Sequence, residues 1–184
     1  MMALSDMASF SDAHECPEIP IIAANLHRLI RPAQSQIWAV LRAGDSLRRI
    51  NYSLVSAMLG VLCLSGDTAA LSPAQWARVE EGLDFYRQVR HIIRDGVSAF
   101  HGEVSSSWRH PVGWQAVVRV SGGETLALIH TFGGGFPARI ALPVRAGRVL
   151  RVLCSENNRV DLSAGQLTAE VSAPFEAVAV HLSE

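Results

Sequence analysis

The sequence contains no lysine, few cysteines and no long hydrophobic run. All 16 basic residues among its 184 are arginine, which excludes a Schiff-base lysine, a lysine general base and the lysine of a P-loop. A formal net charge of -1 does not provide the basic surface that nucleic-acid binders need. The most hydrophobic run, residues 54–64, is far shorter than the roughly 20 residues that cross a bilayer, and no signal-peptide pattern precedes residue 10. We therefore expect a cytoplasmic protein that binds neither nucleic acid nor a membrane.

Cysteine and histidine are too dispersed to predict a metal site. Cys16, Cys63 and Cys154 are odd in number and form no Cys-x-x-Cys pair, so neither a disulfide framework nor a zinc finger is expected. The seven histidines form no His-Glu-x-x-His motif and no pair at ligand spacing beside carboxylates. We expect no metal and no cofactor.

The first half of the chain shows helical periodicity. Residues 19–30 are a helix candidate, a second helix can begin at Asp45 or Ser46, and a third begins after Ser72 with a capping box to Gln75. Apolar runs at residues 36–41 and 60–64 separate these helices and have the length of buried strands. Helices that alternate with buried strands predict a parallel α/β arrangement. A closed eightfold barrel needs about 250 residues, so this half is either a small open α/β domain or the last part of a barrel.

The second half predicts an all-β structure, because after Gly96 the apolar residues alternate in short runs broken by Gly, Pro and Asn. Gly122-Gly123 predicts a tight hairpin between the first two strands, and the whole series predicts a small antiparallel sandwich. We expect two domains, at residues 1–97 and 98–184. The six strand candidates are residues 112–120, 125–132, 139–143, 149–154, 166–171 and 176–182.

Three places have candidate chemistry. The polar segment 10–15 contains Asp12 and His14 just ahead of a helix, and Asp67 follows an apolar run, at what would be the carboxyl end of a parallel strand. Trp38 lies within another short apolar run. Composition alone also allows a structural explanation for each place. Segment 10–15 can be a loop or an N-cap, Asp67 can belong to a turn, and Trp38 can be a core residue.

The same segments, taken together, resemble the retaining α-galactosidases of glycoside hydrolase family 36 (GH36), in clan D. Residues 10–14 resemble the family's (W/F)-(T/S)-S-D-N segment, with Ala13 in place of the asparagine. Residues 32–41 resemble the next barrel strand, and residues 59–67 the last one, after which Leu71-Ser72 matches the start of the last helix. Residues 85–96 are similar to the family's exit from the barrel. The order and spacing of these segments cover essentially the whole chain.

The resemblance implies the C-terminal portion of a (β/α)8 barrel, open because it is partial, followed by a small antiparallel β-sandwich. It implies that Asp12 is the general acid/base, and that His14, Trp38 and Asp67 contact the sugar. The family's nucleophile is an aspartate in a Lys-x-Asp motif, and this chain contains no lysine. We therefore expect a fragment of a glycosidase for α-galactosides or related α-glycosides that is inactive by itself.

Two other functions remain open at this point. One is a non-catalytic sandwich that binds carbohydrate, with an aromatic platform drawn from Trp108, Trp114, Phe132, Phe136 and Phe175, although Trp114 and Phe132 are expected in the core. The other is an interaction module whose partial barrel docks on a second copy or on a complementing chain.

Overall fold

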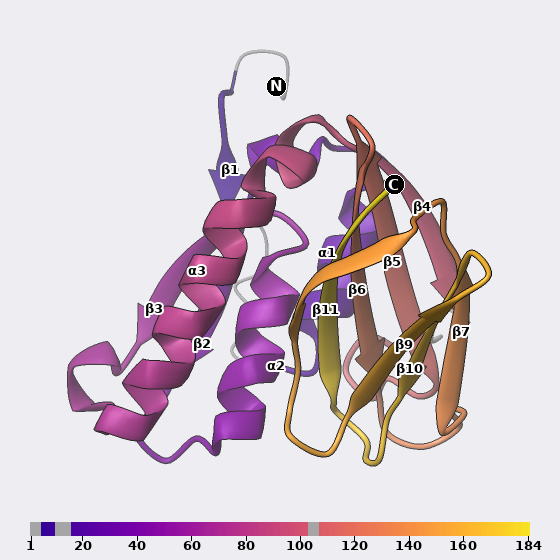
Figure 1. Cartoon of the computed structure of the whole chain (residues 1–184). Coiled ribbons are helices and arrows are strands. Elements are labelled where there is room, and N and C mark those ends of the chain that lie inside the picture. Colours follow the sequence, from indigo (N-terminus) through magenta and orange to yellow (C-terminus); the bar gives the residue numbers. More distant parts are fainter. Residues whose placement is uncertain (1–4, 10–15, 103–106) are drawn as a thin grey trace.

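The computed structural model describes residues 5–9, 16–102 and 107–184. Helices occupy the first half and antiparallel strands the second (Figure 1). The elements in chain order are β1 (Ala8–Ser9), α1 (Ile19–Leu26), η2 (Pro32–Gln34), β2 (Ser35–Leu41), α2 (Leu47–Ala57), β3 (Val61–Gly66), η3 (Thr68–Ala70), α3 (Pro73–Asp95), β4 (Val97–Gly102), β5 (Trp114–Ser121), β6 (Glu124–Thr131), β7 (Arg139–Pro143), β8 (Arg148–Leu153), β9 (Arg159–Ser163), β10 (Gln166–Glu170) and β11 (Ala177–Ser183).

The first sheet has the order β1-β2-β3 and is parallel throughout. Ala8 lies opposite Ser35, and Trp38 lies opposite Cys63. Every second residue of β2, beginning with Ser35, is buried, and the residues between them are half-buried. The prediction of an open parallel sheet in the first half is therefore confirmed, and β1 is a strand that the sequence did not reveal.

The helices begin where the sequence predicts. The Ser72 hydroxyl accepts a hydrogen bond from the Gln75 amide at 3.3 Å, and the Gln75 side chain accepts one from the Ser72 amide at 2.7 Å, which completes the capping box of α3. Ser46 caps α2 in the same way, by accepting a hydrogen bond from the Arg49 amide at 3.2 Å. Gly82 allows α2 and α3 to approach closely, because a Cβ there would lie 2.7 Å from the Leu54 side chain.

The second half contains two antiparallel sheets, with the orders β4-β5-β6-β11-β8 and β7-β10-β9. The predicted hairpin is present, since Gly122 and Gly123 join β5 to β6 with φ values of 57° and 80°. The six-strand prediction is too low: the described residues also contain β4 and β9. Both were missed because their sequences alternate with polar residues and contain only short apolar stretches.

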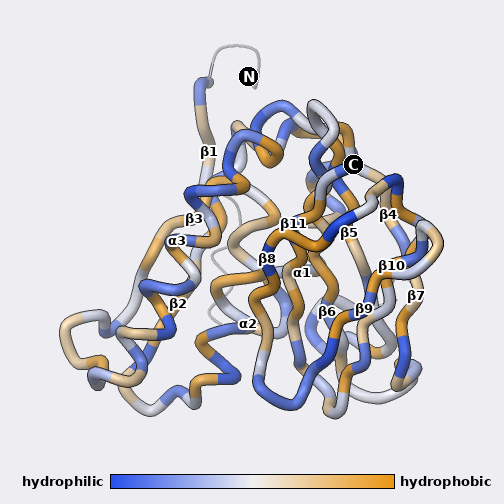
Figure 2. The backbone as a smooth tube through the Cα atoms, in the orientation of Figure 1, coloured by the Kyte–Doolittle hydropathy of each residue, from blue (hydrophilic) through white to orange (hydrophobic). Residues whose placement is uncertain are grey.

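Two hydrophobic cores share the five-stranded sheet. One face of the sheet, including Val117 and Leu128, packs with the helices and the parallel sheet. The other face, including Val118 and Ile129, packs against the three-stranded sheet. Hydrophobic residues line both the helices and the strands at the centre of the molecule (Figure 2). The helices α2 and α3 thus fill the layer between the parallel sheet and the antiparallel strands (Figure 1).

The change from one kind of sheet to the other falls at the end of α3. This helix ends at Asp95, and β4 begins at Val97 and pairs with β5. The first core contains residues from both sides of this point, and the division into domains at residues 97 and 98 stays a prediction. In the part of the chain that the structure describes, no helix is both long and apolar enough to cross a membrane.

Candidate functional site

The parallel sheet brings three strand ends to one edge. β1 ends at Ser9, β2 at Leu41 and β3 at Gly66, and because all three strands run the same way, their carboxyl ends lie together. In open parallel sheets, ligands bind outside the carboxyl ends of the strands. We therefore take this edge as the candidate site.

Asp67 stands at this edge, directly after β3. Gly66 has a φ of 90°, and a Cβ at this position would lie 2.1 Å from the Leu41 carbonyl oxygen, so the tight turn requires glycine. The Asp67 amide donates to the same Leu41 oxygen at 2.7 Å. The Asp67 side chain is exposed and makes no capping bond to η3, so its carboxylate is presented to solvent at the strand end.

The loop after β2 is held by hydrogen bonds that reach across to α3. The Asp45 carboxylate accepts from the Arg42 amide at 2.8 Å. The side-chain amide of Gln75, which is buried, donates to the Ala43 carbonyl at 3.0 Å and to the Asp45 carbonyl at 2.7 Å. Gln75, whose side chain completes the capping box of α3, therefore also fixes the neighbouring wall of the candidate site.

Trp38 lies on the face of the parallel sheet that points away from the helices. Its neighbours Ile37 and Ala39 are fully buried in the first core, whereas Trp38 and Val40 alternate with them and are half-buried. The indole N–H of Trp38 is buried and has no hydrogen-bond partner among the described residues. Trp38 is thus not a residue of the first core, and it shares the sheet, but not the strand end, with Asp67.

Asp12 and His14 lie outside the described residues. The structure therefore places two of the four predicted site residues, and it puts Asp67 at the carboxyl edge and Trp38 on the face that points away from the helices. The acid/base role of Asp12 and the sugar contacts of His14, Trp38 and Asp67 stay predictions. Among the described residues no group of three or more His, Cys, Asp or Glu side chains is placed to hold a metal ion.

Two histidines of the interior are unsuited to acid–base chemistry near neutral pH. Burial and the nearby Arg119 lower the pKa of His27 to about 4, and burial lowers the pKa of His130 to about 3. Neither ring makes a hydrogen bond with the described residues. The rings of His130 and of Tyr52 on α2 pack nearly perpendicular to each other, with 5.5 Å between ring centroids, which gives His130 a packing role.

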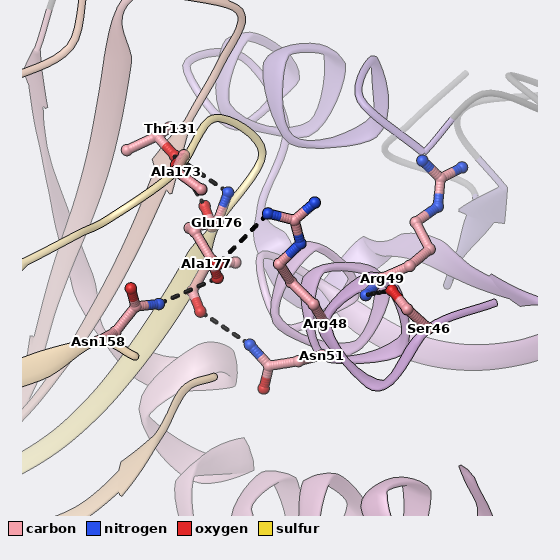
Figure 3. A network of polar contacts seen from close by, with 9 residues as sticks. All are labelled: Ser46, Arg48, Arg49, Asn51, Thr131, Asn158, Ala173, Glu176 and Ala177. Atoms are coloured by element: carbon pink, nitrogen blue, oxygen red, sulfur yellow. Dashed lines mark hydrogen bonds and ion pairs between the residues drawn. The ribbon is translucent and has the colours of Figure 1, made fainter. Parts of the chain in front are cut away.

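A polar network around Glu176 was not predicted. Glu176 is 2% exposed, and its carboxylate accepts a hydrogen bond from the Asn158 side chain at 3.0 Å and faces Arg48 of α2 at 3.8 Å (Figure 3). Asn51 of the same helix donates to the Ala177 carbonyl at 2.8 Å. The signal in the sequence was slight: Glu176 is a single carboxylate at the start of a strand candidate that is apolar except for His181.

Comparisons with known proteins support the expected resemblance at the level of the fold. No family model and no curated protein matches the sequence. Among solved structures, the galactosidase domain of the α-galactosidase-sucrose kinase AgaSK matches with a TM-score of 0.66 and 15% identity, over 95% of this chain and 25% of that chain. The α-galactosidase from Lactobacillus brevis matches with a TM-score of 0.65 and 15% identity, over 95% of this chain and 26% of that chain.

A third match names the family directly. The GH36 α-galactosidase AgaA from Geobacillus stearothermophilus, in a variant bound to 1-deoxygalactonojirimycin, has a TM-score of 0.61 and 14% identity over 94% of this chain and 25% of that chain. The chain thus spans about a quarter of the length of the solved structures it matches. It has the fold of one part of the GH36 α-galactosidases, in agreement with the C-terminal part that the sequence indicated.

Proposed function

We propose that this chain is the C-terminal part of a retaining glycoside hydrolase that acts on α-galactosides or related α-glycosides. The observation that carries the proposal is the fold match to α-galactosidases over 95% of the chain, parallel sheet included. The segments that resemble the family's sugar-binding regions follow β1 and β3 of that sheet. Their positions agree with the general location of active sites in parallel α/β proteins.

On this proposal β1, β2 and β3 are the sixth, seventh and eighth strands of a (β/α)8 barrel. The outer side of the sheet is covered by helices, as in a barrel. The other side carries Trp38 and Val40 on β2 and Cys63 on β3, all of which are half-buried. Side chains that fill a barrel interior would complete the packing of this face.

The proposed chemistry needs two carboxylates, of which this chain supplies one. In retaining glycosidases the two groups lie about 5 Å apart: one attacks the anomeric carbon, and the other protonates the leaving oxygen and then deprotonates water. Asp12, in the segment after β1, is our candidate for the second role. The nucleophile, in the family's Lys-x-Asp motif, has to come from outside these 184 residues, which contain no lysine.

We propose that two further side chains, those of Asp67 and Trp38, bind the sugar in addition to Asp12 and His14. The exposed carboxylate of Asp67 can accept hydrogen bonds from sugar hydroxyls at the strand end. The indole N–H of Trp38, which lacks a partner among the described residues, is a donor on the face that would become the barrel interior.

The uncovered face of the parallel sheet also defines the proposed partner. The remaining strand–helix units of the barrel would cover it, whether they belong to the same polypeptide or to a complementing chain; pairing of two copies is the alternative. A carbohydrate platform on the sandwich finds less support. Phe132 is fully buried, Trp114 and Phe136 pack against the second core, and Phe175 packs against the first.

The proposal is tested by measuring glycosidase activity with and without the rest of the barrel. The chain alone should not hydrolyse an aryl α-galactoside, because it lacks the nucleophile. Combined with the protein segment that carries the Lys-x-Asp strand, it should become active. In that complete enzyme, Asp12→Ala should slow hydrolysis of raffinose far more than hydrolysis of an aryl α-galactoside, whose leaving group departs with little protonation.

Asp6→Asn is the matched control, because Asp6 is an exposed carboxylate just ahead of β1. It should leave both activities unchanged. Activity of the chain alone that survives Asp12→Asn would contradict the proposal, and an equal loss for both substrates would assign Asp12 a structural role.

A further inference from the structure

A cavity of about 380 Å³, lined mainly by residues with polar side chains, lies between the helices and the antiparallel strands. Its walls come from the first turn of α2, from Arg78 of α3, and from the loops at residues 155–157 and 172–176. Among the described residues, those at the carboxyl edge of the parallel sheet, such as Asp67, do not line it, so it is separate from the candidate site described above. Its volume is within the range of small-molecule binding sites.

A buried carboxylate forms part of the wall. Glu176 is 2% exposed, and one of its carboxylate oxygens accepts a hydrogen bond from Asn158 at 3.0 Å. The other oxygen faces the Arg48 guanidinium at 3.8 Å, which is an ion pair but too long for a hydrogen bond (Figure 3). This second oxygen therefore keeps the capacity to accept a hydrogen bond from a ligand.

The backbone holds Glu176 firmly in this position. Its amide donates to the Thr131 hydroxyl at 3.0 Å, and its carbonyl accepts from the Thr131 amide at 2.9 Å. The preceding residue, Phe175, has a φ of 57°, a conformation that is rare for a bulky side chain and that surrounding contacts must enforce. The carboxylate is thus fixed before any ligand arrives, which lowers the entropic cost of binding.

A second polar group of the cavity also has unused hydrogen-bonding capacity. The Ser155 hydroxyl is buried and has no partner among the described residues, although it can donate one hydrogen bond and accept others. Buried polar groups in native proteins are nearly always hydrogen-bonded, so each exception calls for an explanation. A ligand that reached the Ser155 hydroxyl would give it the partner that it lacks among the described residues.

The lining of the cavity contains equal numbers of positive and negative side chains, and this balance favours a neutral ligand. Arg48 and Arg78 stand against Glu156 and Glu176 in the lining. Arg78 is already paired with Glu81 at 2.9 Å. The two carboxylates would repel an anion, and the two guanidinium groups would repel a cation. A neutral ligand rich in hydroxyl groups can donate hydrogen bonds to the carboxylates and accept them from the guanidinium groups.

We propose that this cavity is a second, non-catalytic carbohydrate site that binds one neutral sugar residue between α2, α3 and the loops at residues 155–157 and 172–176. The proposal is independent of the proposed catalytic function, because it uses none of the residues assigned to hydrolysis. No aromatic side chain lines the cavity in the described part of the chain, so hydrogen bonds alone would hold the sugar and we expect a millimolar Kd.

The test is a titration of the full 184-residue chain, labelled with ¹⁵N, with methyl α-D-galactopyranoside and with methyl α-D-glucopyranoside. The amide signals of Ser155, Asn157, Ala173 and Glu176 should shift and saturate for at least one of these sugars. Sodium phosphate, used as an anionic probe, should not produce the same saturable shifts. No saturable shift with either sugar, shifts confined to residues outside the cavity, or tighter binding of phosphate there would overturn the proposal.

Two variants connect binding to the cavity. Glu176→Gln should weaken sugar binding about tenfold, because a charged acceptor is replaced by a neutral one. The matched control is Glu170→Gln on β10, an exposed carboxylate outside the cavity, which should leave the Kd unchanged.

Since Glu176→Gln can also destabilise the fold, Ser155→Leu provides an independent check by filling the cavity with an apolar side chain. It should abolish binding while the dispersed NMR spectrum of the folded chain is retained. A folded Ser155→Leu variant that binds sugar as the wild type does would refute the assignment.

Discussion

The two sheets that face the helices differ in how they are covered, and the difference shows in their sequences. The central strands of the antiparallel sheet are buried on both faces, and β6 is apolar at every position from Leu126 to Ile129. In the part of the chain that the structure describes, the parallel sheet is covered by helices on one face only, and β2 alternates between buried and half-buried residues. An alternating pattern in a parallel strand is unusual, because parallel sheets normally have both faces covered.

This contrast separates the closed cores of the molecule from the face on which we propose that a partner docks. The helices, the antiparallel sheets and the inner face of the parallel sheet together enclose two hydrophobic cores. The face of β2 and β3 that carries Trp38 and Cys63 has no second layer in the described residues. The predictions that follow compare these covered and uncovered regions.

The largest effect is expected in the covered region, at Phe85 of α3. Phe85 is fully buried in the first core, and Phe85→Ala should lower the free energy of unfolding by about 3–5 kcal/mol through lost burial and a new cavity. Leu29→Ala is the control, because Leu29 is 89% exposed, and it should change stability by less than about 0.5 kcal/mol. Urea denaturation followed by circular dichroism measures both. Equal effects of the two variants would show that the helix layer is not the packed centre of the molecule.

The second effect depends on pH and also belongs to the covered region. Burial lowers the pKa of His130 to about 3, so this histidine stays neutral in the folded chain while it becomes protonated in the unfolded chain below its ordinary value of about 6.5. Its contribution to stability is therefore constant above pH 6.5 and is lost progressively as the pH falls from 6.5 towards 3. We expect a loss of a few kcal/mol from this residue over that range.

The variant His130→Leu should flatten this part of the pH profile of stability, since leucine does not titrate and neither ring nitrogen of His130 makes a hydrogen bond with the described residues. His110→Leu, at an exposed position, should leave the profile as it is. Urea denaturation at several pH values measures the difference. If the wild type and His130→Leu lose stability in parallel between pH 6.5 and 4, His130 is not the group responsible.

An intermediate effect is expected at Gln75, which connects the covered layer to the candidate site. Gln75→Ala removes one half of the capping box and the hydrogen bonds to the Ala43 and Asp45 carbonyls, and should destabilise by about 1–3 kcal/mol. Gln88→Ala, an exposed position of the same helix, is the control and should have little effect. Hydrogen exchange should show faster exchange of the Asp45 and Ser72 amides in Gln75→Ala alone. Unchanged exchange would mean that this loop is held by other contacts.

The sequence predicted the elements whose signals are local. The capping box of Ser72 and Gln75 located α3, and Gly122-Gly123 located the hairpin, because each signal acts within a few residues. β1 was missed since two residues give no periodicity, and it forms only by pairing with β2. β9 was missed because only Val160 and Leu162 interrupt its polar sequence, and its pairing with β10 is a tertiary effect.

In the same way, the local features of the candidate site could be predicted from the sequence, whereas contacts between distant segments could not. The position of Asp67 after a strand could be predicted from the Ser65-Gly66-Asp67 turn, and the structure adds that Gly66 is required there by its φ of 90°. The environment of Glu176 could not be predicted. Its partners Arg48 and Asn158 lie on a helix and a loop that are distant in the sequence, and only the packing of α2 against the antiparallel sheet brings them together.

The smallest effect is expected on the uncovered face, and its size decides whether that face is uncovered in solution. Val40 is half-buried on this face, so Val40→Thr should change the free energy of unfolding by less than about 0.5 kcal/mol. The same change in the covered region, Val117→Thr on β5, places a hydroxyl in the first core and should cost about 1–3 kcal/mol. Urea denaturation at low and high protein concentration measures both. If Val40→Thr costs as much as Val117→Thr, and the cost grows with concentration, then a second copy covers the sheet. If the cost stays small at every concentration, the face is free to receive the barrel units that we propose.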